Sequence, residues 1–496
     1  MPTIYYFLTS LRFDAAGNLL PSEQLNFIRY WLSDTSLAAL LAVLIPCAVV
    51  VGIILGVAGF STYIERKLAA DIQRRIGPNQ CNVGSFFGAW ARQIVANAKD
   101  SRATWLARLM AVFCQPVLPI LSIVDKLLLK VAPGVIIFMA DGLKLIMKED
   151  IIADPVDKPL FRLAPLIVMA SALAALAVLP FSDAWYVADF NIGIFYIAAI
   201  TSLEVLGILM AGWASNNKWA LLGGMRSAAQ IVSYELPVGL AILTGVLISG
   251  TMSMQGMTYD QLNLTSQSDC WSNGWFWQWN IFHPAMFILA PIYFLAALAE
   301  CNRTPFDIPE AESELVAGYH TEYSGMRFGF FFMAEYAMMI VVSGIAVTLF
   351  LGGWSTGIAP VEHWLTSGFK LQNGVMVPEF HWIGTLIHLG AFCIKTYSLV
   401  LLMMWIRWTL PRFRVDQMMT LCWKKLIPLS LLCLLLASVW MIIQIPLAAK
   451  LGADTLDHIT FFLRLCFALG VIGWLGWFFL SPLTSKQQAQ YEIANF

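Results

Sequence analysis

The sequence predicts an all-α protein that crosses a membrane several times. Of its 496 residues, 59% are hydrophobic and 12% are charged, whereas a soluble domain carries about 25% charged residues. Apolar runs of about 20 residues recur along the whole chain, and each is long enough for a helix to cross a hydrocarbon layer of roughly 30 Å. A transmembrane barrel would instead show alternating segments of about ten residues. The fold class is therefore a polytopic α-helical membrane protein.

Nine apolar runs are long enough to be transmembrane helices, and the basic residues between them are unevenly distributed. The runs cover residues 37–60, 163–181, 192–213, 229–250, 285–302, 331–353, 384–406, 426–447 and 459–480. Lysine and arginine gather in loops on one side, with fourteen in 64–162, two in 214–228, two in 303–330 and five in 407–425. The positive-inside rule therefore places this side in the cytoplasm and the N-terminus outside.

The chain carries no sequence pattern typical of a bound metal or redox cofactor. Its nine cysteines are scattered and form no C-x-x-C pair, which argues against iron–sulfur and zinc motifs. Its six histidines have no ligand spacing, and neither a G-x-G-x-x-G nor a P-loop is present. If redox chemistry takes place near this chain, we expect the cofactors to belong to a partner.

The long segment between the first two spans contains two amphipathic, basic stretches. "ERKLAADIQRRIGPN", from Glu65, predicts a helix that stops at Gly77-Pro78, and "ADGLKLIMKEDI", from Ala140, also has helical spacing of its apolar residues. Helices of this kind lie in the membrane interface. Composition alone favours a lipid anchor for the first, and the alternative is the mouth of a chamber for an amphipathic ligand. Between them, 105–137 fits a surface helix, a re-entrant pair or two short spans.

The outside loop 251–284 ends in an aromatic cluster, "WSNGWFWQWNIFHP". One interpretation is an interfacial belt of the kind that tryptophan and tyrosine form at membrane surfaces. The other is a hydrophobic patch that a partner subunit covers. The composition of the loop fits both.

Four glutamates lie within or at the ends of apolar runs: Glu204, Glu235, Glu300 and Glu335. A charged carboxylate at the centre of a bilayer costs roughly 2.5–3.5 kcal/mol, so such residues usually face the protein interior or water. A single acid is explained equally well by an interhelical hydrogen bond. Four of them, next to a further acidic loop, favour a path for protons or ions.

That acidic loop lies in "ECNRTPFDIPEAESELVAGYHTEYSGMRF", residues 300–328, which contains six carboxylates. Glu310 and Glu314 share a helical face at spacing i, i+4, and Glu312 lies between them in the chain. Acids this close repel one another and share protons, which is the physical basis of a relay. The alternative is a solvated acidic loop, which the aromatic and apolar neighbours disfavour.

Five stretches resemble, in the same order, successive motifs of one family. They are "ERKLAADIQRRIGPN", "ADGLKLIMKEDI", "AGWASNNKWALLGGMRSAAQIVSYEL", "LAECNRTPFDIPEAESELVAGYHTEYSGMRFGFFFMAEYA" and "WIRWTLPRFRVDQMM". The family is the membrane subunit of proton-pumping NADH–quinone oxidoreductase (respiratory complex I), called the H subunit in bacteria and subunit 1 in mitochondria. The resemblance implies eight transmembrane helices with amphipathic surface helices, to which 459–480 adds a ninth.

The resemblance assigns particular residues to a quinone chamber, to a proton path and to a loop that faces partner subunits. The quinone chamber is expected to contain Glu65, Arg66, Arg75, Arg303, Asp307 and Arg327. The proton path is expected to contain Glu235, Glu300, Glu310, Glu312, Glu314, Glu322 and Glu335. The partner-facing loop is expected to contain Arg407, Arg412, Arg414 and Asp416. No catalytic redox group and no metal ligand is expected in this chain.

The function that the resemblance implies is a non-redox subunit of a translocating NADH:quinone oxidoreductase, with no catalytic activity alone. It would couple quinone reduction to proton pumping, with quinone as the substrate. Iron–sulfur clusters, and FMN as a further candidate, would belong to partner subunits. The expected partners are the iron–sulfur B subunit, the 49-kDa-like D subunit, the membrane subunits A, J and K, and lipid, but no nucleic acid. The expected location is the bacterial inner membrane.

The resemblance also divides the chain and leaves several features outside the family pattern. Residues 1–36 would be an extracytoplasmic segment, 37–454 the quinone-chamber and proton-path domain, and 455–496 an extra helix and tail. The departures are an insertion at about 89–135, enlarged outside loops at 251–284 and 355–383, and Glu204, which stands where an apolar residue is expected.

Two rival functions remain open on the sequence. The same membrane subunit would serve a related quinone reductase fed by another donor, such as ferredoxin, because the donor module is not in this chain. A secondary proton-coupled transporter is the alternative of a different class. Transporters usually contain paired repeats and helices broken at the midplane, and the sequence shows no paired halves.

Overall fold

The structure, a computed structural model, describes most of the chain between residues 56 and 451. The described ranges are 56–79, 137–183, 186–262, 274–308, 315–359, 361–362, 369–372, 375–378 and 382–451, with the single residues 52, 134 and 470. Apart from these single residues, the predicted segment 1–36, the insertion 89–135 and the C-terminal part 455–496 lie outside the described residues. So do most of the first predicted span and nearly all of the ninth.

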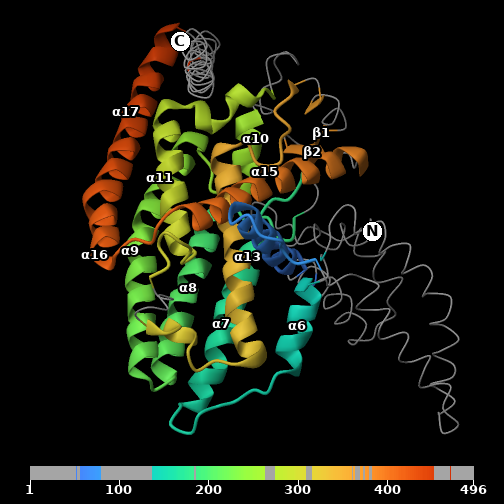
Figure 1. The fold of residues 1–496 in the computed structure, drawn as a ribbon. Coiled ribbons are helices and arrows are strands. Elements are labelled where there is room, and N and C mark those ends of the chain that lie inside the picture. The colour runs from blue at the N-terminus through green and yellow to red at the C-terminus, as the bar shows by residue number, and fades with distance from the viewer. Residues whose placement is uncertain are drawn as a thin grey trace, which may run out of the picture.

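The described part is a bundle of long apolar helices (Figure 1). Six stretches are long and apolar enough to cross a membrane: α7 (Lys158–Leu176), α8 (Gly193–Ala214), α9 (Lys218–Ser249), α13 (Gly325–Phe350), α15 (Trp382–Thr409), and the joined α16 (Val415–Leu421) and α17 (Ile427–Leu451). α11 (Pro284–Glu300) is also apolar but has 17 residues. The predicted fold class is confirmed, and the seven spans predicted between residues 163 and 447 each fall on one of these elements.

Hydrogen bonds between loops show which loops share an end of the bundle. At one end, Asn216 Nδ2 donates to the carbonyl oxygen of Pro155 (3.0 Å), and Asn217 Nδ2 donates to Glu322 Oε1 (2.8 Å). These residues belong to the predicted basic loops or border them, and we call this the basic end. At the other end, Gln255 Nε2 donates to the carbonyl oxygen of Ser182 (3.0 Å). The alternation expected from the charge pattern is therefore present in the described helices.

The sidedness of the two ends gives a testable prediction. Thr251 is exposed at the opposite end and Asp154 is exposed at the basic end. On a background without native cysteines, Thr251→Cys should react with a membrane-impermeant thiol reagent in intact cells, because the positive-inside rule puts its end outside. Asp154→Cys should react only after permeabilisation. The reverse labelling pattern would refute the orientation.

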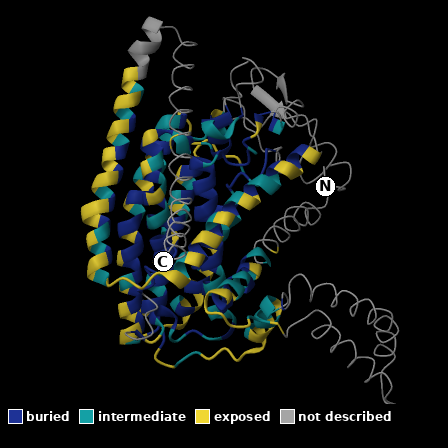
Figure 2. Ribbon diagram, turned by 45° about the horizontal axis from the view of Figure 1, so that its top comes forward, coloured by how far each residue is buried: buried dark blue, intermediate teal, exposed yellow. Residues whose placement is uncertain are grey.

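α13 is the central helix and α15 and α17 lie at the surface (Figure 2). In the most apolar 18-residue stretch of each helix, 83% of the residues are buried in α13, against 28% in α15 and 22% in α16–α17. α13 packs against α7 and α15, while α9 packs against α8, α11 and α17. The exposed leucine and isoleucine side chains along α15 and α17 suit a lipid or protein environment and not water.

α9 extends further than its predicted span. With 32 residues it is about 48 Å long, and the predicted 229–250 covers only about two thirds of it, the part toward the opposite end. Asn217 caps its start by accepting the N–H of Trp219 at 3.0 Å, and Gly250 ends it with a φ of 68°, a conformation that suits glycine. The extra turns at the basic end bring Ser227, which accepts a hydrogen bond from Asn302, to the candidate site.

The two predicted amphipathic stretches are helical at least in part. A helix over residues 56–72 enters the first stretch without a break and ends before Gly77-Pro78. At its end the N–H of Arg75 donates to the carbonyl of Ala70 (2.9 Å), with Arg74 in the left-handed region at φ 52°. The second stretch lies largely in α6 (Ile137–Met147), which has no buried residue, as expected of a surface helix.

The enlarged loops at the opposite end pack against each other. They contain α10 (Met254–Leu262), two 3-10 turns (Phe276–Gln278 and Asn280–Phe282) and an antiparallel hairpin of β1 (Phe369–Gln372) and β2 (Val375–Pro378). The N–H of Phe276 donates to the carbonyl of Gly357 (2.9 Å), and Trp279 Nε1 donates to Ser355 Oγ (3.0 Å). Part of the predicted aromatic belt is thus covered by this chain's own loop.

Candidate functional site

Five side chains from distant parts of the sequence form what we call the ion cluster: Glu65, Arg303, Glu335, Tyr336 and Arg407. Arg303 Nη1 lies 3.6 Å from Glu65 Oε2, and Arg303 Nη2 lies 3.2 Å from Glu335 Oε2. Arg407 Nη1 pairs with Glu65 Oε1, and the hydroxyl of Tyr336 donates to Glu65 Oε2 at 2.5 Å. The side chains of Glu65 and Arg303 are 7% and 3% exposed, so these charges are shielded from water.

Four different elements contribute to the ion cluster. They are α13, α15, the turn that follows α11, and the helix over 56–72. This last helix lies against α13 and α15 in Figure 1. Two carboxylates face two guanidinium groups, and this balance matters because an uncompensated buried charge is strongly destabilising. Arg303 also lies over the ring of Tyr336, 4.4 Å from its centroid. His320 Nε2 lies 3.9 Å from Glu335 Oε1 and extends the cluster toward the basic end.

The turn that carries Arg303 is held by α9. Gln230 Nε2 donates to the carbonyl oxygen of Phe306 (2.8 Å), and Asn302 Nδ2 donates to Ser227 Oγ (3.1 Å). Asn302 has a φ of 49°, which asparagine tolerates better than most residues. The turn and its arginine are therefore fixed before any ligand is present.

A row of three carboxylates lies beside the ion cluster, and we call it the carboxylate row. Glu300 ends α11 and is buried, Glu204 on α8 is also buried, and Glu235 on α9 is half-buried. Glu204 and Glu235 are each close enough to Glu300 for the carboxylate charges to interact. Oε2 of Glu300 has no hydrogen-bond partner among the described residues. Glu204, to which the family resemblance assigned no role, thus joins two predicted path residues.

The other three predicted chamber arginines lie nearer the surface. Arg66 Nη1 pairs with Asp141 of α6 at 2.6 Å. Arg75 is exposed beyond the end of the same helix. Arg327 Nη2 pairs with Asp150 at 2.9 Å. The structure therefore brings Glu65 and Arg303 together and places these three arginines outside the ion cluster.

The predicted partner-facing loop divides between the cluster and the surface. Arg407 lies on α15, which continues to Thr409, and so belongs to the ion cluster. Arg412 Nη2 pairs with Asp307 Oδ2 at 3.2 Å, which links this loop to another predicted chamber residue. Arg414 and Asp416 are exposed, and their contact with a partner stays a prediction.

The predicted proton path is only partly described. Glu335 is in the ion cluster, and Glu235 and Glu300 are in the carboxylate row. Glu322 is half-buried at the basic end, where it accepts the hydrogen bond from Asn217. The loop acids Glu310, Glu312 and Glu314 lie outside the described residues.

Sequence reasoning missed two polar members of the site, Tyr336 and His320. The signal was present, since Tyr336 directly follows Glu335 in "MAEYA" and His320 lies in the acidic loop sequence. Neither the spacing nor the composition indicated a contact with Glu65. Tyr323, near His320 in the chain, donates its hydroxyl to the carbonyl of Phe161 (3.3 Å). Burial raises the pKa of Tyr323 above its usual range, so it acts as a neutral donor.

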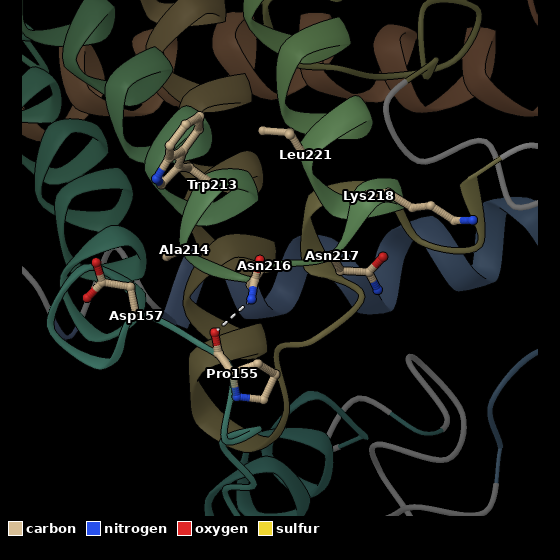
Figure 3. A pocket seen from close by; sticks show the side chains of 8 residues that line it. All are labelled: Pro155, Asp157, Trp213, Ala214, Asn216, Asn217, Lys218 and Leu221. Atoms are coloured by element: carbon tan, nitrogen blue, oxygen red, sulfur yellow. Dashed lines mark hydrogen bonds between the residues drawn. The ribbon is translucent and has the colours of Figure 1, made fainter.

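A separate pocket of about 420 Å³ opens at the basic end, where α8 turns into α9 (Figure 3). Trp213, Asn216 and Lys218 line one side, and Pro155 and Asp157 lie across from them. None of the predicted chamber or path residues lines this pocket. It is therefore distinct from the ion cluster and the carboxylate row.

Comparison with known proteins agrees with the fold and with the motif order. A sequence profile described as NADH dehydrogenase matches residues 128–438. Together with the bundle of apolar helices, this match defines the chain as a polytopic membrane protein of an oxidoreductase family.

Three similar proteins each carry the name of the H subunit of NADH-quinone oxidoreductase. That of Anaeromyxobacter dehalogenans is 46% identical over 314 residues, which cover 63% of this chain and 72% of the relative. That of Chlorobaculum parvum is 46% identical over 312 residues, 62% of this chain and 80% of the relative. That of Bacteroides fragilis is 39% identical over 422 residues, 83% of this chain and 96% of the relative. The chain belongs to the H-subunit family of NADH-quinone oxidoreductase, complex I.

Proposed function

We propose that this chain forms part of a quinone-binding chamber and the first part of a carboxylate path that couples quinone reduction to proton movement. The observation that carries the proposal is the adjacency of the ion cluster and the carboxylate row. Glu300 of the row and Arg303 of the cluster are three residues apart around the end of α11. A change of charge at one is therefore felt at the other, because both are buried and weakly screened.

The chemistry of quinone explains why such a pair of sites is useful. Reduction of a quinone to a quinol consumes two electrons and two protons. Electrons that arrive ahead of protons bring negative charge, which buried guanidinium groups such as Arg303 and Arg407 stabilise. The same negative charge favours protonation of nearby carboxylates. A proton taken up by Glu65 or Glu335 weakens its pairing with Arg303.

Release of Arg303 from one carboxylate then changes the field at Glu300. Glu300 interacts with Glu204 and Glu235, so the three share their protons as a coupled set. The proposed role of the chain is to supply walls, charge and a proton path. The electrons would come from an iron–sulfur cluster of a partner, and FMN would lie in the partner module that oxidises NADH.

The proposed assembly is a bacterial inner-membrane complex. The proposed partners are the iron–sulfur B subunit and the 49-kDa-like D subunit at the basic end, and the membrane subunits A, J and K. The names of the relatives support membership of a complex with several subunits. The exposed Arg414 and Asp416 suit a polar interface with the partners at the basic end.

The surface arginines of the first described helix test the chamber. Arg75 is exposed nine residues after Arg66, a placement that suits the polar neck through which a quinone head group passes. Arg75→Ala should lower kcat/KM for quinone roughly tenfold or more, the scale expected from losing one hydrogen bond to a charged group. Electron transfer to a hydrophilic artificial acceptor should be unchanged, because that reaction does not use the chamber.

The matched control is Arg162→Ala, which removes another exposed arginine at the basic end and should leave both activities at the parental level. Unaltered quinone kinetics in Arg75→Ala would count against a chamber mouth at this position. Loss of both activities in Arg75→Ala would show failed assembly, and the test would then move to Arg75→Gln.

A further inference from the structure

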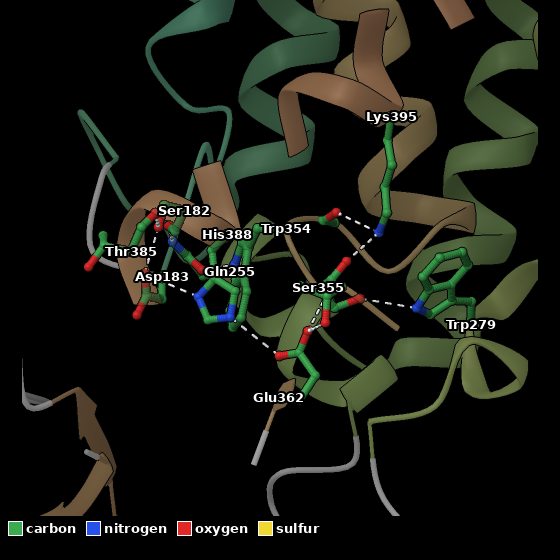
Figure 4. Close-up of polar contacts among 12 residues, drawn as sticks. Ser182, Asp183, Gln255, Trp279, Trp354, Ser355, Glu362, Thr385, His388 and Lys395 are labelled. Carbon is green, nitrogen blue, oxygen red and sulfur yellow. Dashed lines mark hydrogen bonds and ion pairs between the residues drawn. The ribbon is translucent and has the colours of Figure 1, made fainter. Parts of the chain in front are cut away.

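A second group of buried charges lies at the opposite end of the bundle (Figure 4). His388 of α15 sits between two carboxylates, with Nδ1 3.5 Å from Asp183 Oδ1 and Nε2 3.3 Å from Glu362 Oε2. The His388 side chain is 0% exposed, and those of Asp183 and Glu362 are 10% and 3% exposed. The ring of Trp354 lies against the imidazole, with 4.4 Å between the centroids.

Lys395 lies seven residues after His388, on the same face of α15. Its ammonium group donates to the carbonyl oxygens of Leu351, Gly353 and Ser355 at 2.6, 3.1 and 2.6 Å. It also lies 4.0 Å from the centroid of the Trp279 ring, at a distance typical of cation–π contacts. The loop after α13 thus forms a cage around one cation. We call Asp183, Glu362, His388 and Lys395 the clamp.

The clamp fastens α15 to two other parts of the chain. Asp183 follows α7, and its Oδ1 accepts the hydroxyl of Ser182 at 2.6 Å. Glu362 follows α13, and its Oε1 accepts the hydroxyl of Thr356 at 2.6 Å. Both acids are therefore held on their own segments, and His388 is the side chain through which they hold α15.

The charges of the clamp balance in one protonation state. With both acids ionised, Asp183 and Glu362 bring two negative charges, and the ammonium form of Lys395, which its three carbonyl partners favour, brings one positive charge. A protonated His388 brings the sum over these four residues to zero. A buried group with a net charge is costly, so removal of either cation should loosen the clamp.

Within this chain, α15 has less apolar packing to hold it than α13 has, so polar contacts contribute more to its attachment. In its most apolar stretch 28% of the residues are buried, against 83% in that of α13. Arg407, its contribution to the ion cluster, lies 19 residues beyond His388, about 28 Å along the helix axis. A small slide or rotation of α15 at one end is therefore carried to the other.

We propose that the clamp fixes the position of α15, so that Arg407 at the far end of this helix stays paired with Glu65 in the ion cluster. Asp183, Glu362, His388 and Lys395 are then positioning residues for the quinone chamber and do not contact quinone. The inference rests on the proposed function, because it takes the Arg407–Glu65 pair as part of that chamber.

A distance measurement tests the positioning directly. Asp71 on the helix of Glu65 and Thr409 at the end of α15 are both exposed, so Asp71→Cys and Thr409→Cys can carry spin labels in the purified complex on a cysteine-depleted background. Lys395→Met should shift or broaden the distance distribution between the labels. Ile394→Met, a neighbouring change at a side chain that is 73% exposed, should leave it as in the parent. A parental distribution in Lys395→Met would overturn the proposal.

Kinetics of the same complexes test the consequence. Lys395→Met should lower kcat/KM for quinone by up to about 100-fold, the loss that a misplacement of about 1 Å far from the chemistry can cause. Electron transfer to a hydrophilic acceptor should be unchanged. His388→Gln should lower kcat/KM for quinone as Lys395→Met does, because it also leaves the clamp with a net negative charge. The double variant Asp183→Asn with His388→Gln restores the balance and should recover both the distance and the quinone kinetics. A double variant no better than His388→Gln would refute the charge-balanced clamp.

Arg407→Met, measured in parallel, separates the two proposals. Parental quinone kinetics in Arg407→Met would refute the chamber assignment on which the inference rests. Slow quinone reduction in Arg407→Met, with parental distances and kinetics in the clamp variants, would refute the clamp alone.

Discussion

Replacing Arg303 by methionine is expected to abolish quinone reduction by the assembled complex. The side chain of Arg303 is 3% exposed, and its guanidinium nitrogens lie 3.6 Å from Glu65 and 3.2 Å from Glu335. Methionine fills much of the same volume but leaves two buried carboxylates facing the single guanidinium of Arg407. Removing one partner of a buried ion pair costs about 3–5 kcal/mol. In the proposed chamber Arg303 would also stabilise negative charge on the quinone, and the loss of one such group lowers a rate by about 100-fold or more.

The measurement is the quinone reductase rate in membranes, with electron transfer to a hydrophilic acceptor as the check on assembly. Arg303→Lys keeps the charge and should fall between the parent and Arg303→Met, because an ammonium group cannot replace the planar fork that reaches two carboxylates. Arg303→Met with Glu335→Gln removes one charge of each sign and should assemble better than Arg303→Met. Parental quinone reduction in Arg303→Met would show that the ion cluster has no part in the reaction.

The spans were predictable because the bilayer imposes a simple requirement. A helix that crosses it needs about 20 apolar residues and satisfies its own backbone, so each run between residues 163 and 447 indicated a helix regardless of its neighbours. The ends of helices outside the bilayer depend instead on capping side chains. α9 begins at Lys218, eleven residues before its predicted span, because Asn217 caps it and the first turns are only partly apolar. The signal was the cap, which hydropathy does not register.

The hairpin of β1 and β2 also had a sequence signal that hydropathy does not register. Asn373-Gly374 separates the two strands in the sequence, and this dipeptide is the strongest short-range signal for a two-residue hairpin. The chain around it, "FKLQNGVMVP", has the β-branched and aromatic residues typical of strands. The hairpin is shorter than the apolar runs of about 20 residues that indicate transmembrane helices, so those runs do not reveal it.

The pairings within the candidate site could not be predicted from the sequence. Glu65, Arg303, Glu335 and Arg407 are separated by up to 342 positions, and the motifs assigned Arg407 to a different group from Glu65. Which carboxylate meets which guanidinium depends on how α13 and α15 cross. The clamp gave even less signal, because His388 is a lone histidine in an apolar run and its two acids lie on other segments.

Replacing Glu300 by glutamine is expected to leave the complex assembled but to slow both quinone reduction and the proton translocation that is coupled to it. Glutamine keeps the shape of the side chain and its capacity for hydrogen bonds, and it carries no titrating proton. Glu300 occupies the middle of the carboxylate row, within reach of the charges of Glu204 and Glu235, and adjoins the turn of Arg303. Loss of a positioned proton donor or acceptor typically lowers a rate by about 100-fold or more, so proton translocation should fall at least to that extent.

The variants around Glu300 distinguish a proton path from a structural role. Glu300→Asp keeps the proton and shortens the reach, so it should retain more proton translocation than Glu300→Gln. Glu204→Gln should also slow translocation if the row acts as a set, although the family resemblance assigned Glu204 no role. Asp157→Asn is the matched control, because Asp157 is an exposed acid at the basic end outside both clusters, and it should leave translocation at the parental level.

The measurement is proton translocation and quinone reduction in sealed vesicles that contain the assembled variants. In a coupled path, the protonation of Glu300 depends on its neighbours, so Glu204→Gln, Glu235→Gln and Glu300→Gln should each slow both reactions and their effects should not add. A purely structural row would give variants that assemble poorly or variants with parental rates. If all three glutamine variants assemble and both rates stay parental, the acids stabilise the helices and the proton path lies elsewhere.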